Sequence, residues 1–175
     1  MDESKLARFL IDIEAGYSDN FVGIRYHCAT HAADVLRTLH AICTRGGLWV
    51  QAQVSDIGIL CMYLSAVVHD YEHKGVNNDY LTRVSDPLAL LYNDRSPMEN
   101  HHCSASWMLL REHNFLGDKM PFKVLEKLRK TVIDMVLSTD MKQHFTMSSL
   151  WQSKMATLTR PVPVSPSMAG SDSKR

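Results

Sequence analysis

The chain has 175 residues, 45% of them hydrophobic and 22% charged, which is the composition of an ordinary globular protein with one domain and a real core. Nineteen basic and nineteen acidic residues give a formal net charge of +0, which argues against a general affinity for nucleic acid or anionic membranes. No stretch is long and apolar enough to span a bilayer, and residues 1–5 do not resemble a signal peptide.

Apolar residues at helical spacing predict a succession of helices, and no stretch shows the alternation of a strand. We therefore expect a compact all-α fold of many helices. The first helix should end at Gly16, and residues 17–25 should form a connector. The Ser96-x-x-Glu99 spacing predicts a capping box. The expected helices are residues 5–14, 30–43, 57–68, 79–84, a short one begun by Pro87 and broken by residues 92–95, then 96–113, 121–138 and 140–155.

The end of the third predicted helix carries an unusual group of ionisable residues, His69, Asp70, Glu72 and His73. Histidine nitrogens and carboxylate oxygens are common metal ligands, and an aspartate can bridge two metal ions. His73 is one helical turn beyond His69 and can reach the same cavity. A second interpretation stays open for this stretch alone, in which Asp70 belongs to a helix-ending turn and His69 is a core histidine.

A second informative stretch begins at Tyr26 and contains His27 and His31, which lie four residues apart and share one face of a helix. On spacing alone, a partly buried polar face is an equal interpretation. His101 and His102 fall inside a predicted helix, and one of them is expected to make a buried polar contact.

Taken in order, these motifs are Tyr-His-x-x-x-His-Ala-Ala-Asp-Val, His-Asp-x-x-His, Tyr-Asn-Asp, Glu-Asn-His-His and Thr-Asp-Met. Their succession, from about Tyr17 to about Met155, resembles the catalytic domain of class I 3′,5′-cyclic nucleotide phosphodiesterases, in the HD superfamily of helical metallohydrolases. The resemblance implies hydrolysis of cAMP, cGMP or both to the 5′-monophosphate in cyclic nucleotide signalling.

The resemblance also implies two divalent metal ions and a role for each matching residue. His31, His69 and Asp70 match ligands of a tightly held ion, usually zinc. Asp70 also matches the bridge to a second ion, usually magnesium or manganese, and His73 and Thr139 match residues that contact the water around that ion.

Three further residues match the part of the family site that handles the substrate. His27 matches the general acid that protonates the departing 3′ oxygen, and a histidine suits this role because its ordinary pKa of about 6.5 is close to neutral pH. Glu99 matches the carboxylate that orients this histidine. Tyr26 matches a residue that lines the nucleotide pocket.

Two departures from the family pattern stand out. Cys28 follows the acid histidine, where the family usually has Asn. The resemblance also covers only about the first half of the family's catalytic domain, so we expect residues 1–157 to be the N-terminal part of that domain and residues 158–175, rich in Ser, Pro and Gly, to be a disordered tail. An alternative function is therefore a catalytically inactive fragment that binds metal weakly or pairs with full-length subunits.

The expected setting follows from the cysteines and from the family. The four cysteines are scattered and form no Cys-x-x-Cys pair, which indicates a reducing compartment without disulfides and hence a cytoplasmic location. The expected partner is a cyclic nucleotide substrate, without nucleic acid or a membrane segment, and we also consider a homo-oligomer.

Overall fold

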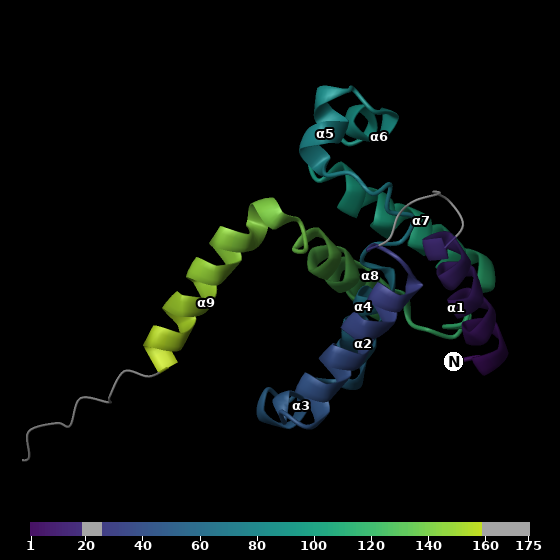
Figure 1. Cartoon of the computed structure of the whole chain (residues 1–175). Helices are drawn as coiled ribbons and strands as arrows, with labels where there is room; N and C mark the ends of the chain where they lie inside the picture. Colours follow the sequence, from purple (N-terminus) through teal and green to yellow (C-terminus); the bar gives the residue numbers. More distant parts are fainter. Residues whose placement is uncertain (19–25, 159–175) are drawn as a thin grey trace, which may run out of the picture.

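The computed structural model describes residues 1–18 and 26–158, and within these ranges every regular element is helical, as predicted (Figure 1). Every element except the short helix at residues 48–51 corresponds to a helix expected from the sequence. The elements are α1 (Glu3–Ser18), α2 (Ala29–Thr44), α3 (Leu48–Gln51), α4 (Asp56–Val68), α5 (Asn78–Arg83), α6 (Pro87–Leu91), α7 (Pro97–His113), α8 (Phe122–Leu137), the 3₁₀ helix η1 (Met141–Gln143) and α9 (His144–Leu158).

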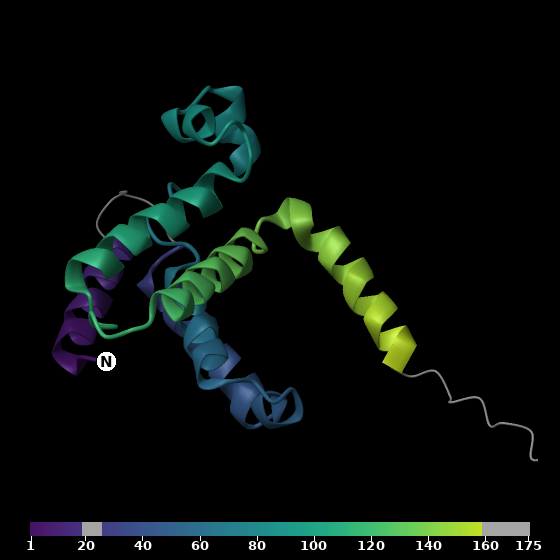
Figure 2. The same ribbon diagram turned by 180° about the vertical axis from the view of Figure 1, so that it is seen from behind.

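Helix α4 lies at the centre of the main body, packed between α2 and α8, while α7 packs against α1 and α8 (Figures 1 and 2). Its sequence, DIGILCMYLSAVV, is apolar on nearly every face, which is typical of a helix covered on several sides. The Ser55 hydroxyl accepts a hydrogen bond from the Gly58 N–H at 3.2 Å and so caps the helix start. The chain leaves α4 at His69.

The main core is formed where α1, α4, α7 and α8 meet, and a smaller core lies beneath α5 and α6. Fully buried aromatic and aliphatic side chains from all four helices or their ends fill the first, including Phe9, Val68, Phe115, Leu128 and Val136. The second core contains Leu81, Ala89 and Met98. Removal of this apolar surface from water supplies the main driving force for folding, at about 25 cal/mol per Å² buried.

The predicted end of the first helix at Gly16 is wrong, because α1 continues to Ser18. Gly16 instead permits close packing: a Cβ atom at this position would lie 2.1 Å from Cε2 of Tyr71. Tyr17, expected in the connector, is a buried helical residue. Residues 19–25 of that connector lie outside the described residues.

The predicted capping box at the start of α7 is also wrong. Ser96 has a left-handed backbone (φ +45°), and its hydroxyl donates to Oδ2 of Asp140 at 2.6 Å instead of capping the helix. The start of α7 is capped instead by Asn78, which precedes Met98 by 20 positions in the sequence. The Asn78 Oδ1 accepts a hydrogen bond from the Met98 N–H at 3.1 Å. Its Nδ2 donates to Oε2 of Glu99 at 2.8 Å, so one amide joins α5 to the first turn of α7.

Helix α9 extends away from the other helices in both views (Figures 1 and 2). Its main packing contacts are with the adjoining η1. Large apolar side chains therefore face solvent along it, including Phe145, which is 81% exposed, and Trp151, which is 66% exposed. Except for residue 158, the predicted tail lies outside the described residues.

Two compositional expectations bear on the fold. All four cysteines are free. None of the helices in the described ranges has the length and apolar character needed to cross a membrane.

Candidate metal centre

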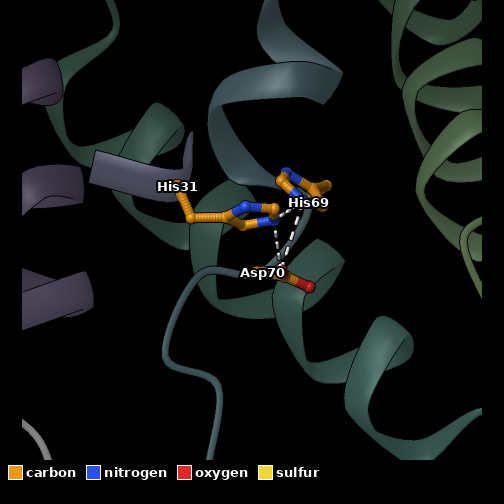
Figure 3. Close-up of side chains that lie close together, drawn as sticks. All are labelled: His31, His69 and Asp70. Atoms are coloured by element: carbon orange, nitrogen blue, oxygen red, sulfur yellow. Dashed lines mark hydrogen bonds and ion pairs between the residues drawn. The ribbon is translucent and has the colours of Figure 1, made fainter. Parts of the chain in front are cut away.

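Three side chains, one from α2 and two from the residues that directly follow α4, meet where α4 ends (Figure 3). His31 lies in the first turns of α2, His69 is the C-terminal cap residue of α4, and Asp70 follows in the turn. Their side chains are 20%, 12% and 16% exposed, so all three are largely shielded from solvent. The structure thus brings together the three residues to which the resemblance gave the role of ligands of one metal ion, although His31 and His69 are 38 positions apart.

The distances among these donor atoms fit one tetrahedral ion. His69 Nε2 lies 3.3 Å from His31 Nε2 and 3.2 Å from Asp70 Oδ2, and His31 Nε2 lies 3.4 Å from the same oxygen. Ligands at ~2.0 Å from a tetrahedral metal ion are ~3.3 Å from one another. The two nitrogens and one oxygen therefore occupy three corners of such a site and can hold a divalent ion with little rearrangement.

Hydrogen bonding orients the His69 ring for this role. Its Nδ1 lies 3.0 Å from the carbonyl oxygen of Ala66, which can only accept, so Nδ1 carries the hydrogen and Nε2 faces the other two ligands. Burial opposes a charge on His69, but the Asp70 carboxylate beside it outweighs this effect and raises the pKa of His69. Burial also works against the charged form of Asp70, yet His69 and the other neighbouring imidazoles lower the pKa of Asp70 to about 2.

The turn that carries Asp70 is held by a side chain from α1. The Tyr17 hydroxyl donates to the Val67 carbonyl at 2.9 Å and accepts from the Asp70 N–H at 3.1 Å. The last helical turn of α4 and the ligand-bearing turn are thus tied to one buried oxygen. The helical spacing of the sequence did not identify Tyr17, which was assigned to the connector.

A second group of donor atoms lies on the other side of Asp70. Potential ligand atoms of Asp70, His73 and His102 lie within 4.8 Å of one another. His73 Nδ1 accepts from the Gly75 N–H at 2.8 Å, so the ring presents Nε2 to this space. Burial and the neighbouring His27 lower the pKa of His73 to about 4. His102 is 1% exposed and is the buried polar residue that the sequence led us to expect at this pair.

The residue matched to the general acid lies next to this second group. The His27 ring stacks on that of His73, with centroids 3.6 Å apart and planes within 9° of parallel. Burial lowers the pKa of His27, while the Asp70 carboxylate acts to raise it. The Tyr26 ring is 67% exposed and lies 4.6 Å from the His31 ring, centroid to centroid.

Two of the matched residues, Glu99 and Thr139, make hydrogen bonds to other groups of the protein. In the described part of the chain, Glu99 is hydrogen-bonded to Asn78 and makes no hydrogen bond to His27. Burial raises the pKa of Glu99, although the bond from Asn78 opposes this. The Thr139 hydroxyl donates to the Val136 carbonyl at 2.7 Å, at the end of α8.

Over the described residues, the regular elements are all helical and a histidine–carboxylate cluster forms a candidate metal centre. Comparison with known proteins identifies the family to which the chain belongs. Residues 26–168 match the family model described as 3′5′-cyclic nucleotide phosphodiesterase. The chain therefore belongs to the cyclic nucleotide phosphodiesterase family, which is metal-dependent.

Individual relatives agree with this assignment. The chain is 36% identical over 143 residues to the rat 3′,5′-cyclic-AMP phosphodiesterase 4C, covering 81% of this chain and 26% of that protein. It is 40% identical over 142 residues to a dual specificity calcium/calmodulin-dependent 3′,5′-cyclic nucleotide phosphodiesterase of Drosophila melanogaster, covering 80% of this chain and 16% of that protein.

A solved structure shows the same fold. The phosphodiesterase domain of the Salpingoeca rosetta rhodopsin phosphodiesterase superposes with a TM-score of 0.78 at 28% identity, over 93% of this chain and 47% of that domain. The chain thus spans about half the length of the solved domain and a smaller share of the curated relatives.

Proposed function

We propose that this protein takes part in metal-dependent hydrolysis of a 3′,5′-cyclic nucleotide, cAMP or cGMP or both, to the 5′-monophosphate. The observation that carries the proposal is the convergence of His31, His69 and Asp70 at the spacing of a tetrahedral metal site, in a chain of this family. The relatives' printed names supply the substrate class.

The residues fit two ions that share Asp70. We assign His31, His69 and Oδ2 of Asp70 to the first ion, as zinc, since zinc favours imidazole nitrogen and carboxylate oxygen in tetrahedral sites. Oδ1 of Asp70, 3.9 Å from His102 Nε2, would be the atom that binds the second ion, which we assign as magnesium or manganese. When bound, such ions neutralise the phosphodiester anion and lower the pKa of water from about 15.7 to near 7.

The chain's own side chains then perform the proton transfers and the positioning. We assign His27 as the acid that gives a proton to the departing 3′ oxygen. Its burial disfavours the charged ring, but a bound phosphate anion in the same space would favour it. We assign Glu99 to its orientation once substrate is bound, His73 and Thr139 to hydrogen bonds with water around the second ion, and Tyr26 to contact with the nucleotide.

The comparisons favour a phosphodiesterase over the alternative of an inactive fragment. A cytoplasmic location is part of the proposal, because the substrate is a signalling nucleotide and all four cysteines are free.

The experiment that tests the function measures cAMP and cGMP hydrolysis by the purified chain with Zn²⁺ and Mg²⁺, and zinc content in parallel. Asp70→Ala should remove both zinc and turnover. His27→Ala should lower turnover by ~10²–10⁴-fold, the usual contribution of a general acid, and keep zinc. His144→Ala, an exposed histidine of α9, is the matched control and should change neither.

The outcomes are distinguishable. Absence of turnover in the wild-type chain with zinc bound would contradict the proposed activity while leaving the metal centre in place. Loss of zinc in His27→Ala would contradict its assignment as the acid.

A further inference from the structure

His102 is a buried histidine to which the proposed mechanism gives no role, and it contacts the metal-binding turn at two points. It lies on α7 and is 1% exposed. Its Nδ1 is 2.5 Å from the carbonyl oxygen of Tyr71, the residue directly after Asp70. Its Nε2 lies 3.9 Å from Oδ1 of Asp70 itself. One rigid ring therefore contacts both the backbone beyond Asp70 and the Asp70 carboxylate.

The arrangement repeats that of the zinc ligand His69. A carbonyl oxygen only accepts hydrogen bonds, so Nδ1 of His102 carries the hydrogen and Nε2 faces Asp70. His69 likewise donates from Nδ1 to a backbone carbonyl and presents Nε2 to Asp70. A histidine with one nitrogen fixed in this way is typical of metal sites, where the fixed bond orients the other nitrogen.

The two histidines face different oxygens of the same carboxylate. His69 and His31 approach Oδ2 at 3.2 and 3.4 Å, and His102 approaches Oδ1. Contacts to both of its oxygens therefore restrain the orientation of the Asp70 carboxylate. A carboxylate held in this way can offer one oxygen to each of two ions.

The turn needs this support because it lies outside the helix. Residues 69–72 follow α4, and Glu72 has a left-handed backbone (φ +58°). Helix α7 supplies a second contact next to the first, since His101 Nε2 lies 2.8 Å from Oε2 of Glu72. The neighbouring histidines of α7 thus hold two consecutive parts of the ligand-bearing turn.

We infer that His102 is a positioning residue for Asp70, which sets the carboxylate so that Oδ1 binds the second divalent ion. This inference rests on the proposed function, because it concerns the ion assigned to that oxygen. His102 Nε2 lies 3.9 Å from Oδ1, so the ring borders this oxygen directly and restrains the orientation of the carboxylate.

Two substitutions separate positioning from simple core packing. Asn places its amide near the position of Nδ1, so His102→Asn keeps the donor to Tyr71 and removes the group that faces Asp70. Gln reaches the position of Nε2, so His102→Gln keeps a polar atom towards Asp70. If His102 only packed the core, the two substitutions would affect metal binding equally.

The test measures Mn²⁺ binding to the zinc-loaded chain by the loss of the free-ion EPR signal, with Zn²⁺ affinity measured by competition with a chelating dye. His102→Asn should weaken Mn²⁺ binding by ~10–100-fold, the usual effect of losing a group that orients a ligand. His102→Gln should recover part of that loss. Circular dichroism checks that each variant is folded.

His113 provides the matched control on the same helix. The His113 side chain is 14% exposed and pairs with Asp12 at 2.6 Å, so His113→Gln also disturbs a largely buried histidine but should leave Mn²⁺ binding unchanged. Wild-type Mn²⁺ affinity in folded His102→Asn would overturn the inference. A wild-type chain that takes zinc but no Mn²⁺ would also overturn it and leave the zinc site intact, whereas a chain that takes no zinc would contradict the proposed function.

Discussion

At the scale of single residues, the candidate site depends on polar groups that are not themselves ligands. Tyr17 is the clearest example, because its hydroxyl is hydrogen-bonded to both Val67 and Asp70. Burial of this phenol raises its pKa well above the usual value, so it stays a neutral donor. Since both hydrogen bonds are partly buried, removing the hydroxyl leaves a donor and an acceptor without their partner.

We expect Tyr17→Phe to lower the free energy of unfolding by ~1–3 kcal/mol, the usual cost of leaving buried polar groups unsatisfied. Urea unfolding of EDTA-treated protein measures this. Zinc affinity should fall as well, because the turn that carries Asp70 loses a contact.

Tyr92→Phe is the control for that substitution. The Tyr92 hydroxyl bonds to the Ser104 hydroxyl at 2.8 Å, and Ser104 has a second partner in the His101 carbonyl. We expect a cost below ~1 kcal/mol and unchanged zinc binding. Equal effects of the two substitutions on zinc would contradict a specific role for Tyr17.

At the scale of elements, the position of α1 against the metal-binding turn depends on a glycine. Gly16 lies within the helix, where glycine is normally unfavourable, and it faces the ring of buried Tyr71. The helix accepts this cost because the close approach brings Tyr17 into reach of Asp70. Packing between elements, and not helix propensity, decides the residue at this position.

Gly16→Ala tests this explanation, because helix propensity and packing predict changes of opposite sign in the free energy of unfolding. Helix propensity alone predicts stabilisation by ~1 kcal/mol. The contact of 2.1 Å between an added Cβ and the Tyr71 ring predicts destabilisation by ~1–3 kcal/mol, since a buried ring cannot move aside freely. We expect the loss, seen as a lower thermal unfolding midpoint.

A double-mutant cycle identifies the clash as the cause. In a Tyr71→Leu background the ring is absent, so Gly16→Ala should cost less than it does in the wild-type chain. The same cost in both backgrounds would show that another contact is responsible.

At the scale of the whole molecule, the main body and α9 differ in how they are stabilised. The body has a continuous core, whereas α9 extends away from it with exposed apolar side chains (Figure 2). Exposed apolar surface of this kind favours association with other apolar surfaces. The folding of the body should therefore depend little on α9.

A chain that ends at Gln143 should retain its unfolding midpoint within ~2–4 °C, which corresponds to ~1 kcal/mol for a protein of this size. It should also be less prone to self-association in sedimentation experiments, because Phe145 and Trp151 are removed. A chain that ends at Thr139 is the control. It lacks Asp140, which accepts from the Ser96 hydroxyl, and should be clearly less stable. Similar losses in both chains would contradict the independence of α9.

Local patterns in the sequence predicted most of the helices, because apolar residues at a helical period mark the buried face of each one. The failures occurred where a distant contact decides the outcome. Ser96 has the right spacing for a capping box but bonds to Asp140, and Gly16 reads as a helix end but serves the packing of Tyr71. The four-residue helix α3 carries too few residues for a period to be detected.

The sequence by itself determined the all-α class, the family and the candidate ligands, because these are properties of composition, local period and motif order. Only the tertiary structure decided that His31 meets His69 and Asp70 at tetrahedral spacing, and that Tyr17 and His102 hold the turn between them. The physical reason is that such contacts join side chains from different helices. Their distances depend on how the helices pack, and the spacing of residues along one helix does not predict that packing.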